Sequence, residues 1–385
     1  MKLANRSPRC RKKEKIGIPK IAELAKVSLG TVDRALHARK GVSEATRKRI
    51  LQIAQHIGYT PNLAARMLSV GRATVRIGVV IPREPHIFYD QLRDGILDES
   101  RRTGSMGVEI DYQPSERLGV GECERLREML SADLRAVILT PGDPQCLKPL
   151  IDEAELKNIR VICVASDAPG SSRSSVVCID PELGGRLAAE LMAWSLPPGA
   201  KTAVVTGMLH TEDHRKKAEG FCTTLPQCCE GGVVTEVVEG HEDEEETFEK
   251  CLNILHRYPD IKGLYVNTVL CMPVCYALKA AGLAGKVRLI TTDLFQEMVP
   301  FFEKHVIHAS IYQRPYVQGQ NAIRLIVEHA FHGRSIPATH YLNPSIVLRS
   351  NLYKFRETRH LQTASTRAVP IESETVLAGT GASRE

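Results

Sequence analysis

Short runs of apolar residues, many of them β-branched, recur along the chain from Val75 onward. Such runs are typical of parallel strands that are buried on both faces. They cover residues 75–81, 108–112, 136–140, 161–165, 176–179, 202–206, 233–238, 263–267, 287–291 and 308–312. Segments with helical spacing lie between most of them, including 123–130, 183–194, 246–255 and 318–329. This alternation predicts α/β architecture with doubly wound parallel sheets, and its length favours two such subdomains.

Residues 17–36 carry a helical pattern instead. Apolar residues recur at helical spacing from Ile18 to Ala25, and Ser28 can cap a second helix that ends at Leu36. The pattern predicts two short helices joined by a tight turn, which is either a helix-turn-helix or an ordinary helical hairpin in a core. Ser43 can cap a third helix with apolar positions at Ile50, Ile53, Ala54 and Ile57. Residues 62–68 follow as a helical stretch that is too short to be stable alone.

The charge distribution favours the helix-turn-helix. Residues 1–76 hold 18 Lys and Arg against 4 Asp and Glu, so they carry a net charge of +14. The rest of the chain carries a net charge of −8, and the whole chain +6. A basic segment on an acidic body is the electrostatic footprint of a nucleic-acid-binding head, because neutralising phosphates supplies most of the sequence-independent affinity.

The composition sets further limits on the class of protein. No apolar run reaches the length of a membrane span, and the basic N-terminus lacks the apolar core of a signal peptide, so we expect a cytoplasmic protein. The 11 cysteines are an odd number and are scattered, which predicts reduced thiols rather than a disulfide framework. Neither Cys271 and Cys275 nor Cys228 and Cys229 has a second pair or a histidine at zinc-finger spacing, so no metal is predicted. The acidic run 242–246 is expected to be a solvated helix start.

Several short motifs resemble those of the lac repressor (LacI) family of bacterial transcription regulators, over about residues 17–355. In the head these are Ile21-Ala-Glu-Leu-Ala-Lys-Val-Ser28, Thr31-Val-Asp-Arg34, Gly41-Val-Ser43, Thr46-Arg47, Gly58-Tyr-Thr-Pro-Asn62 and Ala64-Ala65. In the body they are Ile77-Gly-Val-Val80, Gly220-Phe221, Thr292-Asp293, Gln313-Arg-Pro315, Gly319 and Ala322. The body resembles the family's periplasmic-binding-protein-like effector domain, and most closely its ribose-binding type.

The resemblance implies which residues of the head meet DNA. The second helix enters the major groove, where Leu29, Gly30 and Arg34 match base-reading positions and Thr31 matches a phosphate-contacting position. Gly30 has no side chain, so base reading falls more heavily on Leu29 and Arg34. Leu68 matches the hinge leucine that wedges into the minor groove of the operator, with Ala65 beside it. The implied DNA-binding set is Ser28, Leu29, Gly30, Thr31, Arg34, Asn62, Ala65 and Leu68.

The resemblance also implies a ligand between two lobes, at the carboxyl ends of the strands. Phe88 and Tyr89 match an aromatic pair on which sugars stack. The implied ligand-binding set is Phe88, Tyr89, Asp167, Lys217, Asn267, Asp293 and Gln313. Two positions depart from the family pattern, because Lys217 stands where arginine is common and Thr268 where an aspartate is expected. A lysine gives a point charge instead of a bidentate clamp. Carboxylates, amides and aromatic rings together favour a neutral polyol, most simply a sugar.

Together these observations predict a ligand-controlled transcription repressor that binds operator DNA as a homodimer or a tetramer. The expected domains are a basic arm (1–16), a helix-turn-helix domain (17–61), a hinge helix and linker (62–74), a two-lobed effector-binding and dimerisation domain (75–355) and a disordered tail (356–385). An exported sugar-binding protein would share the body, but it would need a signal peptide and would have no basic head, so the sequence disfavours this alternative. No GxGxxG follows a strand and no P-loop is present, so we expect no enzyme activity, no catalytic residues and no cofactor.

Overall fold

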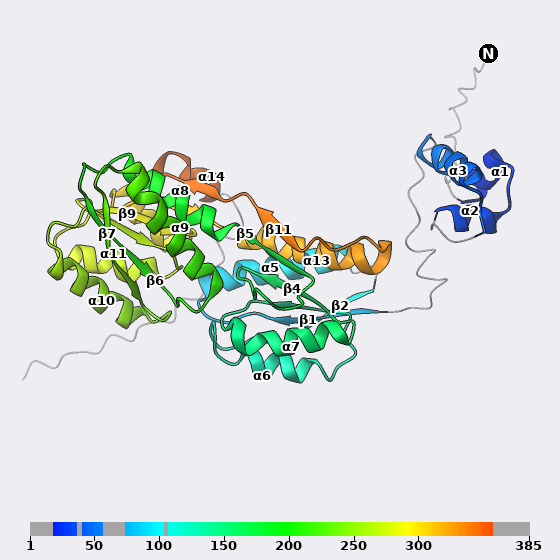
Figure 1. The fold of residues 1–385 in the computed structure, drawn as a ribbon, viewed down its shortest axis with the longest axis horizontal. Helices are drawn as coiled ribbons and strands as arrows, with labels where there is room; N and C mark the ends of the chain where they lie inside the picture. The colour runs from blue at the N-terminus through cyan, green and yellow to red at the C-terminus, as the bar shows by residue number, and fades with distance from the viewer. Residues whose placement is uncertain (1–17, 37–40, 57–73, 104–106, 357–385) are drawn as a thin grey trace, which may run out of the picture. The chain divides into compact units, whose positions relative to one another are not determined.

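The chain forms two compact units, a head before Thr74 and a body from Thr74 onward. The computed structural model describes residues 18–36, 41–56, 74–103 and 107–356 (Figure 1). The basic arm, the hinge residues 62–73 and the C-terminal tail from residue 357 lie outside the described residues.

The head is a bundle of three short helices, α1 (Ile18–Ala25), α2 (Leu29–Leu36) and α3 (Glu44–His56). Both predicted N-caps are confirmed, because Ser28 Oγ accepts from the Thr31 N–H and Ser43 Oγ accepts from the Thr46 N–H, each at 3.2 Å. The apolar positions of the three helices meet in one small core, formed by Ile21, Ala22, Ala25, Val32, Ala35, Ile50 and Ala54. This core holds α2 in place while leaving its outer face exposed.

The body has two lobes, each built on a six-stranded sheet. The sheet of the first lobe has the order β11-β5-β4-β3-β1-β2 and is parallel throughout. Its strands are β1 (Val75–Val80), β2 (Val108–Tyr112), β3 (Ala136–Leu139), β4 (Arg160–Val164), β5 (Ser175–Ile179) and β11 (Thr339–Leu342). Helices α5 (His86–Thr103) and α13 (Pro315–His332) cover one face, and α6 (Glu122–Met129) and α7 (Pro144–Leu156) cover the other (Figure 1).

The sheet of the second lobe has the order β12-β10-β9-β8-β6-β7, and only β12 is antiparallel to its neighbour. Its strands are β6 (Lys201–Thr206), β7 (Val233–Glu239), β8 (Gly263–Val266), β9 (Arg288–Thr292), β10 (Ile307–Tyr312) and β12 (Ser345–Val347). Helices α8 (Pro181–Ala193) and α9 (Glu212–Cys228) pack on one face. The other face is covered by α10 (Glu244–Arg257), α11 (Cys271–Ala280), α12 (Val299–Glu303) and α14 (Leu352–Arg356).

The predicted α/β architecture with two doubly wound subdomains is confirmed. Each of the ten apolar runs coincides with a strand, since buried parallel strands must be apolar on both faces. The sequence pattern did not predict β11 and β12, which are short and lie at sheet edges. The chain returns to the first lobe through α13 and β11, and the last described elements, β12 and α14, belong to the second lobe.

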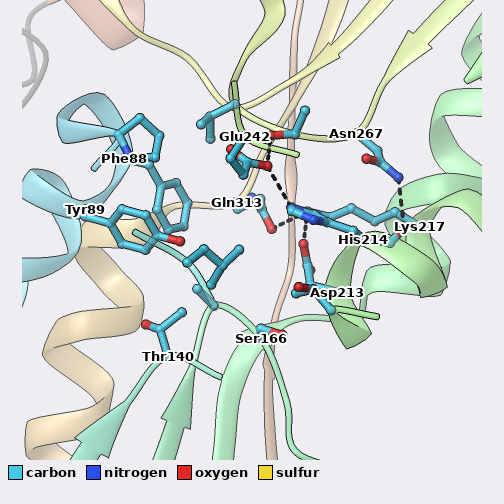
Figure 2. Close-up of a pocket in the computed structure, with 16 residues that line it drawn as sticks. Phe88, Tyr89, Thr140, Ser166, Asp213, His214, Lys217, Glu242, Asn267 and Gln313 are labelled. Carbon is cyan, nitrogen blue, oxygen red and sulfur yellow. Dashed lines mark hydrogen bonds and ion pairs between the residues drawn. The ribbon is translucent and has the colours of Figure 1, made fainter. Parts of the chain in front are cut away.

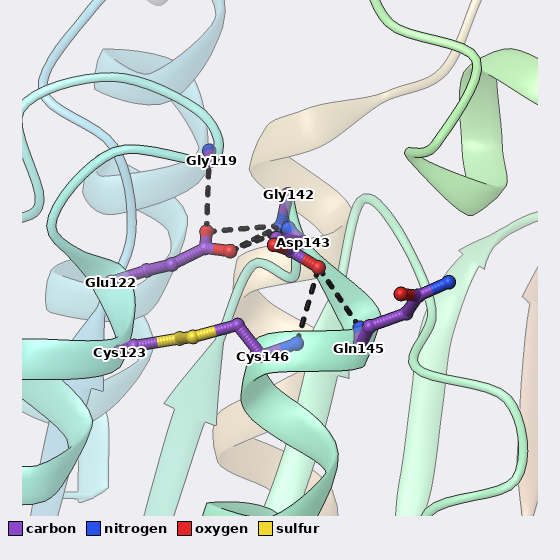
Figure 3. The surroundings of a disulfide bond; sticks show 7 residues. All are labelled: Gly119, Glu122, Cys123, Gly142, Asp143, Gln145 and Cys146. Carbon is purple, nitrogen blue, oxygen red and sulfur yellow. Dashed lines mark hydrogen bonds between the residues drawn. A yellow bond between two sulfur atoms is a disulfide. The ribbon is translucent and has the colours of Figure 1, made fainter.

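One pair of cysteines contradicts the expectation of reduced thiols. Cys123 and Cys146 form a disulfide between the first turns of α6 and α7 (Figure 3). The two helices pack side by side and bring the Cα atoms within 6.5 Å, a proximity that sequence spacing does not reveal. The other cysteines of the described part are free thiols.

Among the described residues, no helix combines the length and the apolar character that a membrane span needs. Within the same residues, no group of three or more His, Cys, Asp and Glu side chains could hold a metal ion.

Candidate functional site

A cavity lies between the two lobes, where the carboxyl ends of the strands of both sheets face each other (Figure 2). It encloses about 410 Å³ of space that atoms do not fill, part of it open to solvent. Residues that follow strands line it, among them Thr140 after β3, Ser166 after β4 and Asn267 after β8. Strand ends are the usual ligand position in such sheets, because the loops there are free to carry polar groups.

Two aromatic residues at the start of α5 form the apolar side of the cavity (Figure 2). The rings of Phe88 and Tyr89 lie edge to face with centroids 5.1 Å apart. Burial raises the pKa of the Tyr89 hydroxyl well above its ordinary value, so it stays protonated. Both residues were predicted to line the site, and a flat ring face there can cover the C–H side of a small ligand.

On the opposite side of the cavity, Lys217 of α9 is held in a network of hydrogen bonds. Its Nζ donates to Asp213 Oδ2 at 2.6 Å and to Gln313 Oε1 at 2.8 Å. Lys217 is only 1% exposed, so an unpaired ammonium there would be costly, and Asp213 balances its charge. Burial raises the pKa of Asp213 and Lys217 opposes that rise.

Asp293 supports this network from behind and is not among the residues that line the cavity. Its Oδ1 accepts from the Gln313 N–H at 3.0 Å, and its Oδ2 accepts from Gln313 Nε2 at 2.7 Å. These two bonds fix the Gln313 amide so that its Oε1 faces Lys217. Burial raises the pKa of Asp293 to about 6, and Lys217 opposes that rise. In the structure Asp293 therefore positions Gln313, whereas the sequence predicted that Asp293 contacts the ligand directly.

Asp167 also lies outside this cavity. It lines a second, neighbouring cavity, and Arg173 Nη2 donates to its Oδ2 at 2.6 Å. Of the predicted ligand-binding set, the structure brings five residues to the main cavity, namely Phe88, Tyr89, Lys217, Asn267 and Gln313.

His214 and Glu242 line the cavity and were not predicted. His214 Nδ1 accepts from the Met208 N–H at 3.0 Å, which places the ring proton on Nε2. Burial lowers the pKa of His214 to about 3, so the ring is neutral. Glu242 Oε1 lies 3.6 Å from His214 Nε2 and accepts from Thr268 Oγ1 at 2.6 Å.

Glu242 corrects the expectation of a solvated acidic run. Residues Glu244–Glu246 do begin α10, but the Glu242 side chain is 6% exposed and points into the cavity. Burial raises its pKa to about 7. The preceding loop residues, His241 and Glu242, both have positive φ, which turns the chain before α10 starts. Gly207 makes room for the carboxylate, since a Cβ there would lie 2.1 Å from Glu242 Oε1.

Four polar atoms in the cavity wall are buried without a hydrogen-bond partner in the protein. They are Thr140 Oγ1, Ser166 Oγ, Asp213 Oδ1 and Asn267 Oδ1. The Asn267 amide is oriented by Nδ2, which donates to the His214 carbonyl at 2.9 Å. Each such atom costs about 1–3 kcal/mol unless it is satisfied, so their convergence in one cavity indicates a polar ligand.

The two lobes also touch at the rim of the cavity. Thr211 Oγ1 of the second lobe donates to the Gly142 carbonyl of the first at 2.8 Å. Glu122 holds that loop rigid, because its buried carboxylate accepts from the N–H groups of Gly119, Gly142 and Asp143 (Figure 3). A change in the angle between the lobes would break or make the Thr211 bond.

In the head, α2 presents the predicted recognition face to solvent. Leu29 is 54% exposed, and Gly30 and Arg34 are exposed one turn apart. Arg34 Nε donates to the Gly30 carbonyl at 3.1 Å along the helix. Ser28 and Thr31 sit at the start of the same helix, where their hydroxyls lie 2.9 Å apart. The other predicted DNA contacts, Asn62, Ala65 and Leu68, lie outside the described residues.

Comparison with known families agrees with both parts of this arrangement. Residues 18–62 match the family described as bacterial regulatory proteins, lacI family, and residues 77–334 match the periplasmic binding protein domain. The chain belongs to the lacI family, with a periplasmic binding protein domain as its body. The first range covers the three helices of the head, and the second covers the two lobes except for β11, β12 and α14.

Curated relatives point the same way. Catabolite control protein A of Priestia megaterium is 28% identical over 209 residues, covering 54% of this chain and 60% of that protein. This chain therefore spans less than two thirds of that relative. The ribose import binding protein RbsB of Bacillus subtilis (strain 168) is 22% identical over 281 residues, covering 72% of this chain and 89% of that protein.

Solved structures share the fold of the body. A solute binding protein of an ABC transporter from Burkholderia graminis, in complex with D-arabinose, is 20% identical with a TM-score of 0.67. The alignment covers 73% of this lacI-family chain and 97% of the chain of the solute binding protein. GanP, a glucose-galactose binding protein from Geobacillus stearothermophilus, is 23% identical with a TM-score of 0.66. The alignment covers 72% of this chain and 99% of GanP. At these identities the likeness concerns the fold alone.

Proposed function

We propose that this protein is a transcription repressor whose affinity for operator DNA is controlled by a small polyhydroxylated ligand, most simply a sugar. The observation that carries the proposal is the joining of a lacI-family head to a body whose cavity holds four unpartnered polar atoms. Such a protein acts in the cytoplasm, on the bacterial nucleoid. No enzymatic step is part of the proposal.

The chemistry of the cavity supports a polyol. Hydroxyl groups donate and accept, so they can satisfy both the acceptors Asp213 Oδ1 and Asn267 Oδ1 and the hydroxyls of Thr140 and Ser166. An aromatic wall opposite these groups suits a sugar ring, which has one apolar face. Relatives and structural neighbours that bind ribose, arabinose or glucose and galactose, according to their names, support this class.

DNA binding is assigned to α2 of the head. Leu29, Gly30 and Arg34 face base edges in the major groove, where the side chains of Leu29 and Arg34 read them, and Thr31 contacts a phosphate with Ser28 beside it. We assign further DNA contacts to Asn62, Ala65 and Leu68, which lie outside the described residues, with Leu68 as the minor-groove wedge. One recognition helix buries too little surface for specific affinity, so the active form is a homodimer or a tetramer on a palindromic site.

The ligand controls DNA binding through the lobes. Because a ligand in the cavity contacts both lobes, it binds one inter-lobe angle better than others and shifts the population toward it. The Thr211 to Gly142 hydrogen bond responds to that angle directly. The change then reaches the head through the segment that precedes β1, which couples the two sites.

The test begins with selection of duplex DNA from a random pool by the full-length chain. The expected result is an enriched inverted repeat, with two or more chains per duplex in analytical ultracentrifugation. Enrichment of no sequence, or one chain per duplex at saturation, would contradict the DNA-binding half of the proposal.

The ligand half is tested by calorimetric titration with pentoses, hexoses, polyols, sugar phosphates and purines. At least one sugar or polyol is expected to bind, and its affinity is expected to fall in Asn267→Ala. Binding of a purine alone, unchanged in Asn267→Ala, would contradict the assigned ligand class and the assigned cavity.

A further inference from the structure

Glu242 is a buried carboxylate that receives little support from the protein. Its side chain is 6% exposed, and Thr268 Oγ1 is its hydrogen-bond donor at 2.6 Å. His214 Nε2 lies 3.6 Å from Oε1, which is too long for a hydrogen bond. A carboxylate has about four acceptor sites, so most of the capacity of Glu242 is directed at the cavity.

The charged groups that face Glu242 do not neutralise it. His214 of α9 is neutral, because its Nδ1 accepts from Met208 and burial lowers its pKa to about 3. Lys217 of the same helix is already paired with Asp213 at 2.6 Å. Tyr89 of α5 is a protonated phenol, because burial and the nearby carboxylates raise its pKa. The cavity lining therefore holds one more carboxylate than ammonium group, and it contains no arginine among the described residues.

A buried charge without a counter-charge is costly, so it is kept only where something offsets the cost. We propose that the ligand carries a protonated primary amine on its polyhydroxylated frame, and that this ammonium group binds against Glu242. The inference rests on the proposed function, since it names the ligand class of the same cavity. It goes beyond a neutral sugar, whose hydroxyls could donate to Glu242 but would supply no counter-charge.

The other free acceptors fit the same class of ligand. Asp213 Oδ1 and Asn267 Oδ1 both lack partners, so three neighbouring side chains of the second lobe offer oxygen acceptors to the ligand. A lining rich in acceptors selects molecules rich in N–H and O–H donors. An anionic ligand such as a sugar phosphate would meet Glu242 and Asp213 with like charge.

The experiment compares matched ligands on the full-length chain by calorimetry. Each pair differs by one group, such as glucose with glucosamine and galactose with galactosamine, and the N-acetyl derivatives remove the charge while keeping the nitrogen. One amino sugar is expected to bind at least about tenfold more tightly than its hydroxyl counterpart, as befits a charge-assisted hydrogen bond. N-acetylation should remove that gain.

Two variants assign the preference to Glu242. Glu242→Gln keeps the shape and the Thr268 contact, and it should bring the affinity ratio of amine to hydroxyl ligand close to one. Glu245→Gln is the matched control, because Glu245 is exposed in the same acidic run and does not line the cavity. It should keep the preference of the wild type.

The pH dependence of ligand affinity provides an independent test. Ammonium binding requires ionised Glu242, and burial raises the pKa of that carboxyl to about 7. Affinity for an alkylamine polyol, whose amine titrates like a lysine, should thus rise about tenfold between pH 6 and pH 8 in the wild type. In Glu242→Gln that rise should be lost.

The inference is overturned if each amino sugar binds no better than its hydroxyl counterpart, if none binds, or if Glu242→Gln leaves the ratio unchanged. Binding of a neutral sugar without preference for the amine would overturn this inference and leave the proposed function standing. Binding of purines instead of any polyol would overturn the ligand class of the proposed function as well.

Discussion

Replacing Glu242 by glutamine should stabilise the ligand-free body at neutral pH. The carboxyl has an ordinary pKa of 4.5 and a pKa of about 7 in the folded protein, chiefly because burial penalises its charge. The folded state therefore binds the proton more tightly than the unfolded state does. Consequently the contribution of Glu242 to the free energy of unfolding falls as pH rises from 4.5 to 7.

The size of the effect follows from the two pKa values. A difference of this size corresponds to about 3 kcal/mol, at 1.36 kcal/mol for each pKa unit. Glutamine has no charge to bury, so the free energy of unfolding of Glu242→Gln minus that of the wild type should rise by about 3 kcal/mol across this window. A binding-site residue kept at a cost to stability is a familiar trade-off.

The assay is urea unfolding of both proteins between pH 4.5 and pH 8, followed by far-ultraviolet circular dichroism. His214 acts in the opposite direction, because its lowered pKa makes the fold lose stability on acidification. That contribution is present in both proteins and cancels in the difference. A difference that stays flat, or that falls with pH, would refute the view that Glu242 is an uncompensated buried carboxylate.

Three further predictions address other parts of the molecule. Asp293→Asn has one acceptor oxygen and cannot accept from both the Gln313 N–H and Gln313 Nε2, so it should weaken ligand binding by about 1–3 kcal/mol in calorimetry while leaving ligand-free DNA affinity unchanged. An unchanged ligand affinity would contradict the view that Asp293 positions Gln313. Arg34→Ala should relax base preference at one position of each half-site, at about 1–3 kcal/mol if the contact is bidentate, and an identical selected sequence would exclude that reading. Cys123→Ser removes the disulfide that closes a loop between cysteines 23 positions apart, and it should lower the free energy of unfolding by about 3 kcal/mol. Equal stability of the wild type with and without a thiol reductant would contradict this.

The fold could be predicted from the sequence because most of its strands are buried on both faces. Runs such as 136–139 and 176–179 are apolar throughout, a pattern that is typical of a parallel sheet covered on both sides. The edge strands β11 and β12 could not be predicted, since Thr339–Leu342 and Ser345–Val347 have mixed burial and no uninterrupted apolar run.

The site was predictable only in part. Residues that directly follow a strand, such as Asn267 and Gln313, could be placed at the cavity because the position of a strand end is fixed by the strand itself. Glu242 was hidden in an acidic run, and nothing local separates it from the exposed Glu245 except the positive φ of the turn. His214 lies within a helix, and its contacts with Met208 and Asn267 come from segments that the helical pattern does not connect.

The disulfide shows the same limit for cysteine pairing. Cys123 and Cys146 belong to separate helices, and only the packing of α6 against α7 brings them together. Spacing along the chain does not determine such a pair.

The most direct test of the account measures operator affinity with and without ligand. A labelled duplex carrying the selected inverted repeat is titrated with the full-length chain, by fluorescence anisotropy, in the presence of each sugar and amino sugar of the panel. We predict that a compound that binds the body changes the Kd for this duplex by about tenfold or more, within the usual range of coupling, and leaves the weak binding to a scrambled duplex unchanged. A compound that saturates the cavity in calorimetry while the operator Kd stays the same would contradict the claim that the cavity controls DNA binding.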